Sequence, residues 1–276
     1  MALGKMRKSI FSLKSWLFTP ATKSDRFGRA AEVDADALII DLGDAVAPSA
    51  KKDARAAALR YLAQIPADHL PSALRINSPE TKFGFDDLQD LLNSPAEPDY
   101  VVLPKCNSAV LIGQAGNLLR EPKNAAQIIG LIESAKAIEA LEEIVDGEVK
   151  PAALFFGAAD MAGNLGADTA WEPLLYVRSR VVQVTARAGI VAIDSPYLEI
   201  RDTEGLKHEA RASVSLGFHG KCAIHPAQIA PINEPLTPTE QKVADARQTL
   251  VVNRKAEASR CTLDPSFAYR HCCPVC

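Results

Sequence analysis

The sequence has no excess of positive charge, no long apolar run and no low-complexity segment. Its 31 Lys and Arg residues face 34 Asp and Glu residues, and the net charge of -3 argues against a general nucleic-acid binder. No apolar run approaches the roughly 20 residues that span a membrane. The 18 prolines and 15 glycines are scattered rather than clustered. We therefore expect a globular protein with neither nucleic acid nor membrane among its partners.

Cysteine is scarce in the body of the chain. Only Cys106 and Cys222 lie there, and four further cysteines crowd the last sixteen residues, a distribution unlike a disulfide framework. We predict that residues 253–276 form an atypical Cys-rich tail. His271 and its neighbouring cysteines are an alternative metal site, but tetrahedral zinc sites need paired ligands with a turn of chain between them. A poorly structured terminus is favoured.

Residues 1–14 are predicted to be an N-terminal extension. Residues 1–24 hold five Lys or Arg and no acid, but no apolar segment of a signal peptide and no small-residue cleavage site follows. A transit peptide is an alternative, although the first predicted strand begins near Ser15. We therefore expect the protein to be cytoplasmic.

Short apolar runs recur along the chain, and each is followed by a segment with helical periodicity. The predicted strands cover residues 15–20, 36–41, 73–77, 100–104, 127–133, 152–157, 190–194 and 220–225. The predicted helices cover residues 24–31, 50–62, 85–92, 108–119, 135–145, 173–188, 203–216 and 239–255.

Eight strand–helix units in about 250 residues match a (β/α)8 barrel in number and size. The strands are continuous apolar runs, as expected for strands that are buried on both faces. A doubly wound open sheet is the alternative, but no Gly-rich dinucleotide motif follows the first strand. We predict one α/β domain, a (β/α)8 TIM barrel over residues 15–252, with a C-terminal helical extension.

Polar residues end many of the predicted strands, and the chemistry of a barrel lies at these ends. Asp41 and Asp194 could instead cap the following helix or pair inside the barrel, and Lys105 could form an ion pair at the rim. The strand-end residues are Thr19, Asp41, Asp44, Arg75, Asn77, Lys105, Glu133, Asp160, Asp194 and His225.

Glu133 and Asp160 are the strongest candidates for a metal site. Two carboxylates near one mouth repel each other unless a cation lies between them. Oxygen ligands without a nearby Cys or His favour Mg²⁺ over zinc. Two carboxylates also leave coordination positions for water and substrate oxygens. The sequence therefore predicts a magnesium site.

Nine segments, in order over about residues 15–250, resemble the HpcH/HpaI aldolase and citrate lyase β-subunit family, and within it the CitE-like acyl-CoA lyases. The segments are Leu17–Ala21, Ala37–Val46, Arg75–Asn77, Leu103–Lys105, Leu131–Ser134, Phe156–Asp160, Tyr176–Arg180, Ala192–Asp194 and Gly217–Pro226.

The resemblance implies a Mg²⁺-dependent barrel that cleaves or forms a carbon–carbon bond in a 3-hydroxyacyl thioester. Glu133 and Asp160 match the two metal ligands, and Glu133 also faces the substrate. Arg75 matches the substrate-binding arginine, whose charge can neutralise a developing enolate. These three residues are the predicted catalytic residues.

The same resemblance implies a CoA thioester as substrate and a homotrimer or hexamer as assembly. Thr19, Lys23 and Arg26 fall where family members hold the CoA moiety. Asp41 and Asp44 are expected around the metal ligands rather than on the metal.

Two departures from the family pattern bear on activity. The family's Asp-Leu-Glu-Asp motif has Gly43 in place of its glutamate, and loss of that residue is expected to weaken Mg²⁺ binding, with Asp44 compensating in part. Relatives also end in a lid whose Asp serves a neighbouring subunit as acid/base. No lid motif is recognisable after Val252.

We predict an acyl-CoA lyase that converts (S)-citramalyl-CoA to pyruvate and acetyl-CoA. The opening segment from Ser15 to Thr22 and the short body resemble stand-alone members of the itaconate pathway. One alternative is the β subunit of a citrate lyase, which acts on citryl attached to a carrier protein. The other alternative is a catalytically impaired member with a binding or assembly role, indicated by Gly43 and the missing lid.

Overall fold

The fold was analysed in a computed structural model that describes residues 9–30, 32–66, 69–119 and 126–258. The chain divides into two compact units, residues 1–236 and 237–276. Of the predicted N-terminal extension, only the part from Ser9 is therefore described, and the predicted Cys-rich tail is described only as far as Ala258.

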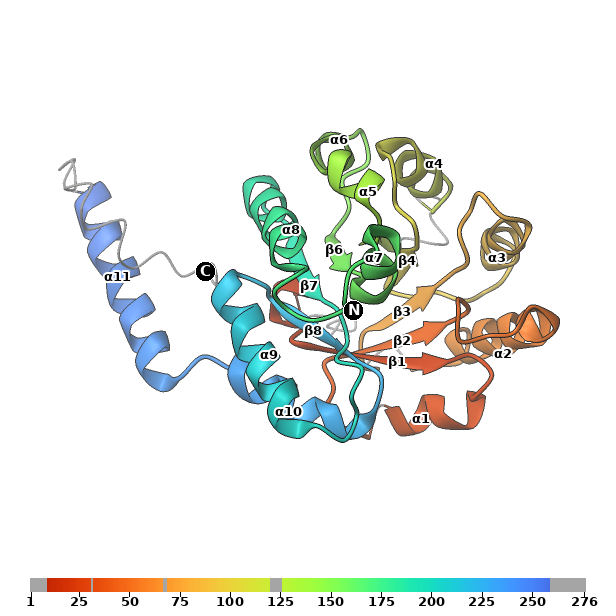
Figure 1. The fold of residues 1–276 in the computed structure, drawn as a ribbon, viewed down its shortest axis with the longest axis horizontal. Helices are drawn as coiled ribbons and strands as arrows, with labels where there is room; N and C mark the ends of the chain where they lie inside the picture. Colours follow the sequence, from red (N-terminus) through yellow and green to blue (C-terminus); the bar gives the residue numbers. More distant parts are fainter. Residues whose placement is uncertain (1–8, 31, 67–68, 120–125, 259–276) are drawn as a thin grey trace, which may run out of the picture. The chain divides into compact units, whose positions relative to one another are not determined.

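Eight parallel strands close into a barrel in chain order, and β1 pairs with β8 (Figure 1). This closure confirms the predicted TIM barrel and excludes the open sheet. The register places Pro20, Asp41 and Arg75 side by side at the carboxyl ends of the first three strands. The strands are β1 (Ser15–Pro20), β2 (Ala37–Asp41), β3 (Ser72–Arg75), β4 (Tyr100–Leu103), β5 (Gln127–Ile132), β6 (Ala153–Phe156), β7 (Val191–Asp194) and β8 (Gly220–Ala223).

Helices surround the strands in the first unit (Figure 1). The short 3₁₀ segments are η1 (Ile10–Ser12), η2 (Ser24–Arg26), η3 (Pro48–Ala50) and η4 (Pro226–Gln228). The α-helices of this unit are α1 (Phe27–Ala30), α2 (Lys51–Leu62), α3 (Lys82–Leu92), α4 (Ala109–Leu119), α5 (Ala135–Glu139), α6 (Leu141–Asp146), α7 (Ala158–Leu165), α8 (Leu175–Ala188), α9 (Thr203–Leu216) and α10 (Ile229–Leu236).

Two of these helices were not predicted. Helix α7 begins directly after the sixth strand and contains Gly163 and Asn164, which have poor helix propensity. Helix α10 contains Pro231 and Pro235, residues that normally argue against a helix interior. The sequence therefore assigned the helix after the eighth strand to residues 239–255, which belong to the second unit.

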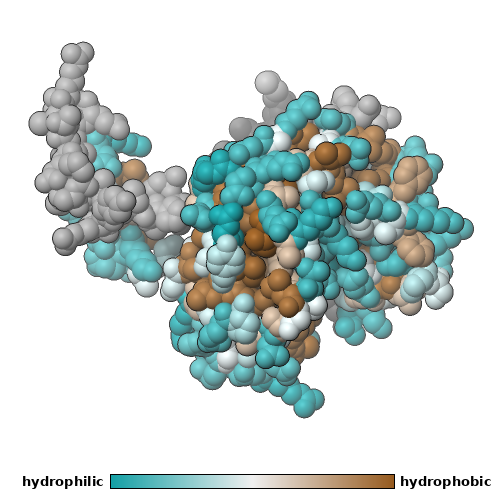
Figure 2. Space-filling model, turned by 45° about the horizontal axis from the view of Figure 1, so that its top comes forward, coloured by the Kyte–Doolittle hydropathy of each residue, from teal (hydrophilic) through white to brown (hydrophobic). Residues whose placement is uncertain are grey.

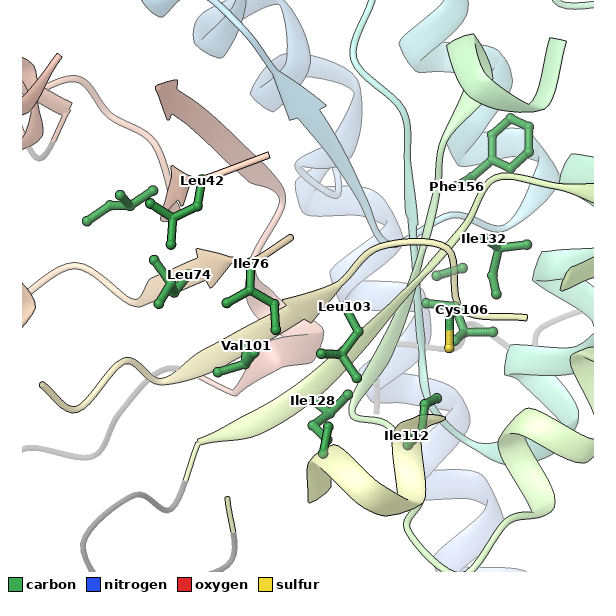
Figure 3. Packing of buried hydrophobic residues seen from close by; sticks show 14 of the residues in the cluster. Leu42, Leu74, Ile76, Val101, Leu103, Cys106, Ile112, Ile128, Ile132 and Phe156 are labelled. Atoms are coloured by element: carbon green, nitrogen blue, oxygen red, sulfur yellow. The ribbon is translucent and has the colours of Figure 1, made fainter. Parts of the chain in front are cut away.

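The barrel has two apolar clusters, one on each face of its strands. Neighbouring residues alternate between them: Leu38 and Ile40 belong to the first cluster and Ile39 to the second. The second cluster fills the barrel interior around Trp16. Figure 3 shows members of the first cluster, including Ile112 of α4 beside residues of neighbouring strands. Burial on both faces explains why the strands are continuous apolar runs.

The second unit contributes helix α11 (Glu240–Ala258). The residues described on it from Glu240 to Arg254 are exposed or half-buried. Across the described ranges, no helix combines the length and the apolar character needed to cross a bilayer. On the face drawn in Figure 2, hydrophilic side chains surround an apolar area.

A buried charge cluster joins the last two strands to the helices behind them. Lys221 of β8 is fully buried, and its Nζ donates to Asp194 of β7 at 2.7 Å and to Glu209 of α9 at 2.7 Å. Arg178 of α8 donates from Nε to Asp194 at 3.1 Å, and Ser213 also donates to this carboxylate. Although burial opposes its ionisation, Lys221 and Arg178 lower the pKa of Asp194 to about 2. Asp194 therefore pairs with buried cations and does not cap the next helix.

Replacing Lys221 by methionine should strongly destabilise the barrel. The substitution leaves Asp194 and Glu209 buried with one cation fewer, and breaking a buried pair from one side costs about 3–5 kcal/mol. Lys207→Met is the matched control. Lys207 lies on the same helix as Glu209 but forms only surface ion pairs, with Glu204 and Glu234, so this substitution should cost less than about 1 kcal/mol. Urea unfolding measures both. Equal losses in the two variants would contradict the buried role.

Candidate active site

A cavity of about 1040 Å³ opens at the carboxyl ends of the strands. It brings together five predicted site residues that lie far apart in the sequence. Loops after β6 and β7 form much of the remaining wall. The predicted site residues in its lining are Asp41, Asp44, Arg75, Glu133 and Asp160.

Glu133 follows β5 and is 5% exposed. Its Oε1 accepts the backbone N–H of Lys105 at 2.7 Å, and Lys105 adopts a left-handed backbone with φ of 52° to present that amide. Burial and the nearby carboxyl of Asp160 raise the pKa of Glu133 to about 8. The Lys105 amide opposes this rise but does not cancel it.

Asp160 lies in the first turn of α7 and is exposed to the cavity side. The approach of this turn to Glu133 requires Gly157, because a Cβ there would lie 2.8 Å from the Cβ of Glu133. A short helix that begins immediately after the strand thus places the second carboxylate beside the first.

Arg75 at the end of β3 is held by two carboxylates. Its Nε and Nη2 donate to the two oxygens of Asp41 at 2.6 and 2.8 Å, and Nη2 lies 3.4 Å from Asp44. The guanidinium also lies over the ring of Phe18, 5.3 Å from its centroid. Burial opposes its charge, but the charge and hydrogen bonds of Asp41 raise the pKa of Arg75 above its ordinary value. Arg75 therefore stays protonated, and Asp41 fixes its direction.

Gly43 lies against this arginine. A Cβ at position 43 would be 2.9–3.0 Å from the Nη2, Cζ and Nε atoms of Arg75. The backbone N–H of Gly43 also donates to Asp41 at 2.8 Å. A glutamate here could be accommodated only if Arg75 moved away from Asp41. A side chain at position 43 would therefore act on the site by displacing the guanidinium of Arg75.

The carboxylate pair fits a hard divalent cation. No group of three or more His, Cys, Asp or Glu is gathered in the described part of the chain. Burial and the nearby carboxyl of Asp160 nevertheless oppose the ionisation of Glu133, and a cation between the two carboxyls would relieve this cost. Two oxygen donors suit Mg²⁺, which keeps several waters and binds through one or two carboxylates.

The residues predicted to hold CoA do not line this cavity. Thr19 is buried within β1, whereas Lys23 and Arg26 are exposed in the segment that follows this strand. Their role stays a prediction.

Two further strand-end residues have structural partners. The side chain of Asn77 donates to Asp87 at 2.7 Å and accepts from Lys51 at 2.6 Å. His225 accepts the backbone N–H of Ala227 at 3.2 Å and caps η4. The side chain of Lys105 forms no ion pair with any described residue, so the predicted rim pair is absent from that part of the chain.

The sequence did not predict that an aromatic residue forms part of the cavity wall. Trp171, in the loop between α7 and α8, lines the cavity and lies over Arg178. The segment Tyr176–Arg180 carried the family resemblance and could have drawn attention to Arg178. Nothing in the sequence marked the loop tryptophan.

Residues 14–226 match the HpcH/HpaI aldolase/citrate lyase family. The chain belongs to this family. The predicted family and the predicted enzyme class, a carbon–carbon lyase, are therefore confirmed. The L-malyl-CoA/beta-methylmalyl-CoA lyase of Rhodobacter capsulatus is 31% identical over 268 residues, which cover 88% of this chain and 84% of that protein.

Solved structures agree with this membership. RipC from Yersinia pestis is 41% identical, with a TM-score of 0.75 over 84% of this chain and 99% of that chain. CitE from Mycobacterium tuberculosis, solved in complex with magnesium, acetoacetate and coenzyme A, is 30% identical. Its TM-score is 0.74 over 89% of each chain.

In EDTA the protein should lose stability as the pH rises from about 5 to about 8. The pKa of Glu133 is raised from 4.5 to about 8 on folding, so its stabilising contribution is present at low pH and lost as pH rises. One proton gives a slope of up to about 1.4 kcal/mol per pH unit. Urea unfolding at several pH values should show a flatter profile for Glu133→Gln. Glu139→Gln, on the exposed face of α5, should keep the wild-type slope. Equal slopes in all three proteins would contradict the buried, neutral Glu133.

Gly43→Ala should destabilise the protein through the contact with Arg75. Overpacking of this kind costs about 1–3 kcal/mol, and the Asp41 pair prevents the guanidinium from yielding freely. Gly113→Ala in α4 is the control, because a Cβ there meets nothing within 4 Å and helix propensity favours alanine. Urea unfolding that shows no difference between the variants would exclude the close contact.

Proposed function

We propose that the protein is a Mg²⁺-dependent lyase that cleaves a 3-hydroxyacyl-CoA between the carbinol carbon and the carbon next to the thioester. The observation that carries this proposal is the juxtaposition of Glu133 and Asp160 in one cavity with the charged Arg75. Family membership and the names of the relatives, a malyl-CoA lyase and a CitE with magnesium and coenzyme A, support it.

Glu133 and Asp160 would hold the metal, which polarises the hydroxyl and the forming carbonyl of the substrate. The backbone amide of Lys105 fixes the direction of the Glu133 carboxylate. The carboxyl of Asp160 interacts with the same Glu133 side chain.

Arg75 would bind the thioester or carboxylate oxygen on which negative charge develops. Its guanidinium remains charged during the reaction, because Asp41 stabilises the protonated form. Since Asp41 takes Nε and Nη2, the remaining nitrogen Nη1 is the donor available to the substrate. The donor is thus fixed before the charge appears, which is the condition for electrostatic stabilisation of a transition state.

Within this class we propose (S)-citramalyl-CoA, cleaved to pyruvate and acetyl-CoA, as the substrate. The opening segment from Ser15 to Thr22 supports this choice through its resemblance to the stand-alone itaconate-pathway members. Thr19, Lys23 and Arg26 are proposed to hold the CoA moiety, and a homotrimer or hexamer is the proposed assembly. A citrate lyase β-subunit activity is the alternative, favoured by the similarity to CitE over 89% of the chain.

Removal of either metal-binding carboxylate should abolish Mg²⁺-dependent cleavage. Glu133→Gln and Asp160→Asn should each lose at least about 100-fold in kcat, because metal polarisation supplies several kcal/mol of transition-state stabilisation. Asp53→Asn is the matched control, since Asp53 is exposed in the first turn of α2 and does not line the cavity. Release of keto acid and CoA is followed with citramalyl-, malyl- and citryl-CoA. Full activity of Glu133→Gln would overturn the assignment, and a preference for citryl-CoA would favour the alternative.

A further inference from the structure

Arg178 lines the cavity as a buried side chain with a fixed orientation. It is 1% exposed, and its Nε and Nη2 donate to Asp194 at 3.1 Å and to the Ser195 hydroxyl at 3.4 Å. Its third nitrogen, Nη1, is buried without a hydrogen-bond partner among the described residues. The guanidinium is therefore held from one side by β7, and another kind of contact must stabilise its remaining faces.

Aromatic rings supply that contact. The guanidinium carbon lies 4.5 Å from the ring centroid of Trp171 and 5.0 Å from that of Phe156. Tryptophan is the best cation–π partner, and the interaction strengthens when the cation is removed from water. Phe156 is 1% exposed, whereas Trp171 is half-buried and lies in a loop. Trp171 is thus the accessible member of a cation–π stack whose other members, Arg178 and Phe156, are buried.

This stack adjoins the carboxylate pair. Phe156 ends β6, and Asp160 follows four residues later in the first turn of α7. Trp171 lines the same cavity as Glu133 and Asp160. A substrate that bound through its hydroxyl and carboxylate to a metal held by Glu133 and Asp160 would direct the third group of its carbinol carbon toward a neighbouring wall.

We propose that Trp171, positioned by Arg178, is the specificity-determining residue for the non-reacting substituent on the carbinol carbon, and that it favours a small apolar group. This inference rests on the proposed function. A methyl group gains apolar contact with the indole face. A carboxymethyl group would place a second anion in a wall that also contains Asp168 and Glu172, which are close to Trp171 in the sequence, and these like charges would repel it.

Arg178 does not serve that second anion as a partner. Its free nitrogen exposes less than 1 Å² to solvent. A ligand carboxylate therefore cannot reach Nη1 in this conformation. The arginine acts through the tryptophan and is a positioning residue.

Keto acids that bind without turnover provide the first test. Binding of pyruvate and of glyoxylate in Mg²⁺ is measured by calorimetry for the wild type, Trp171→Ala and Trp171→Phe, all full-length. We expect the wild type to prefer pyruvate and the alanine variant to lose that preference by about tenfold, the usual range for one methyl group in an apolar site. Trp171→Phe should retain most of it. If the alanine variant does not fold, Trp171→Gln keeps the side-chain length without the ring and repeats the measurement.

Steady-state kinetics with citramalyl-, malyl- and citryl-CoA provide the second test. Trp171→Ala should raise KM for citramalyl-CoA relative to KM for malyl-CoA, because only the former presents a methyl group to the indole. Arg178→Lys keeps a cation beside Asp194 but loses the planar stack, and should shift the same selectivity ratio in the same direction.

The outcomes separate the two proposals. A wild-type protein that binds neither keto acid and cleaves no thioester overturns the proposed function and this inference together. A wild-type protein that does bind or cleave them, with unchanged selectivity in a folded Trp171→Ala, overturns the inference alone.

Discussion

The buried carboxylate of Asp194 connects the fold to the site. Two cations bind this carboxylate. Lys221 of β8 also pairs with Glu209 of α9, and Arg178 of α8 also contacts the ring of Trp171 in the loop before that helix. A charge removed from water is tolerated only when its partners are well placed. The position of the cavity wall on this side of the barrel therefore depends on buried ion pairs.

The two faces of the cavity use charge in different ways. On one side, Asp41 neutralises the charge of Arg75 and fixes the direction of its guanidinium. On the other side, burial and the neighbouring carboxyl of Asp160 suppress the ionisation of Glu133. A cation between the two carboxyls would relieve this cost, so this side of the cavity favours a cation.

Much of this arrangement was predictable from the sequence. Apolar runs followed by helical periodicity located all eight strands, because strands buried on both faces leave an unambiguous pattern. Glu133 and Arg75 were found because charges at strand ends are not explained by packing. Helix α7 and the Trp171 wall were not found, since the first has weak propensity and the second depends on a contact between distant segments. The consequence of Gly43 also required coordinates, because the side chain that fills its space comes from another strand.

The left-handed backbone at Lys105 has a consequence for how this site tolerates sequence change. The orientation of Glu133 is set by a main-chain amide, and the side chain of Lys105 points away, exposed. Asparagine or glycine would adopt the same conformation at least as easily as lysine. The charge at this position of the rim can therefore vary while the carboxylate of Glu133 keeps its geometry.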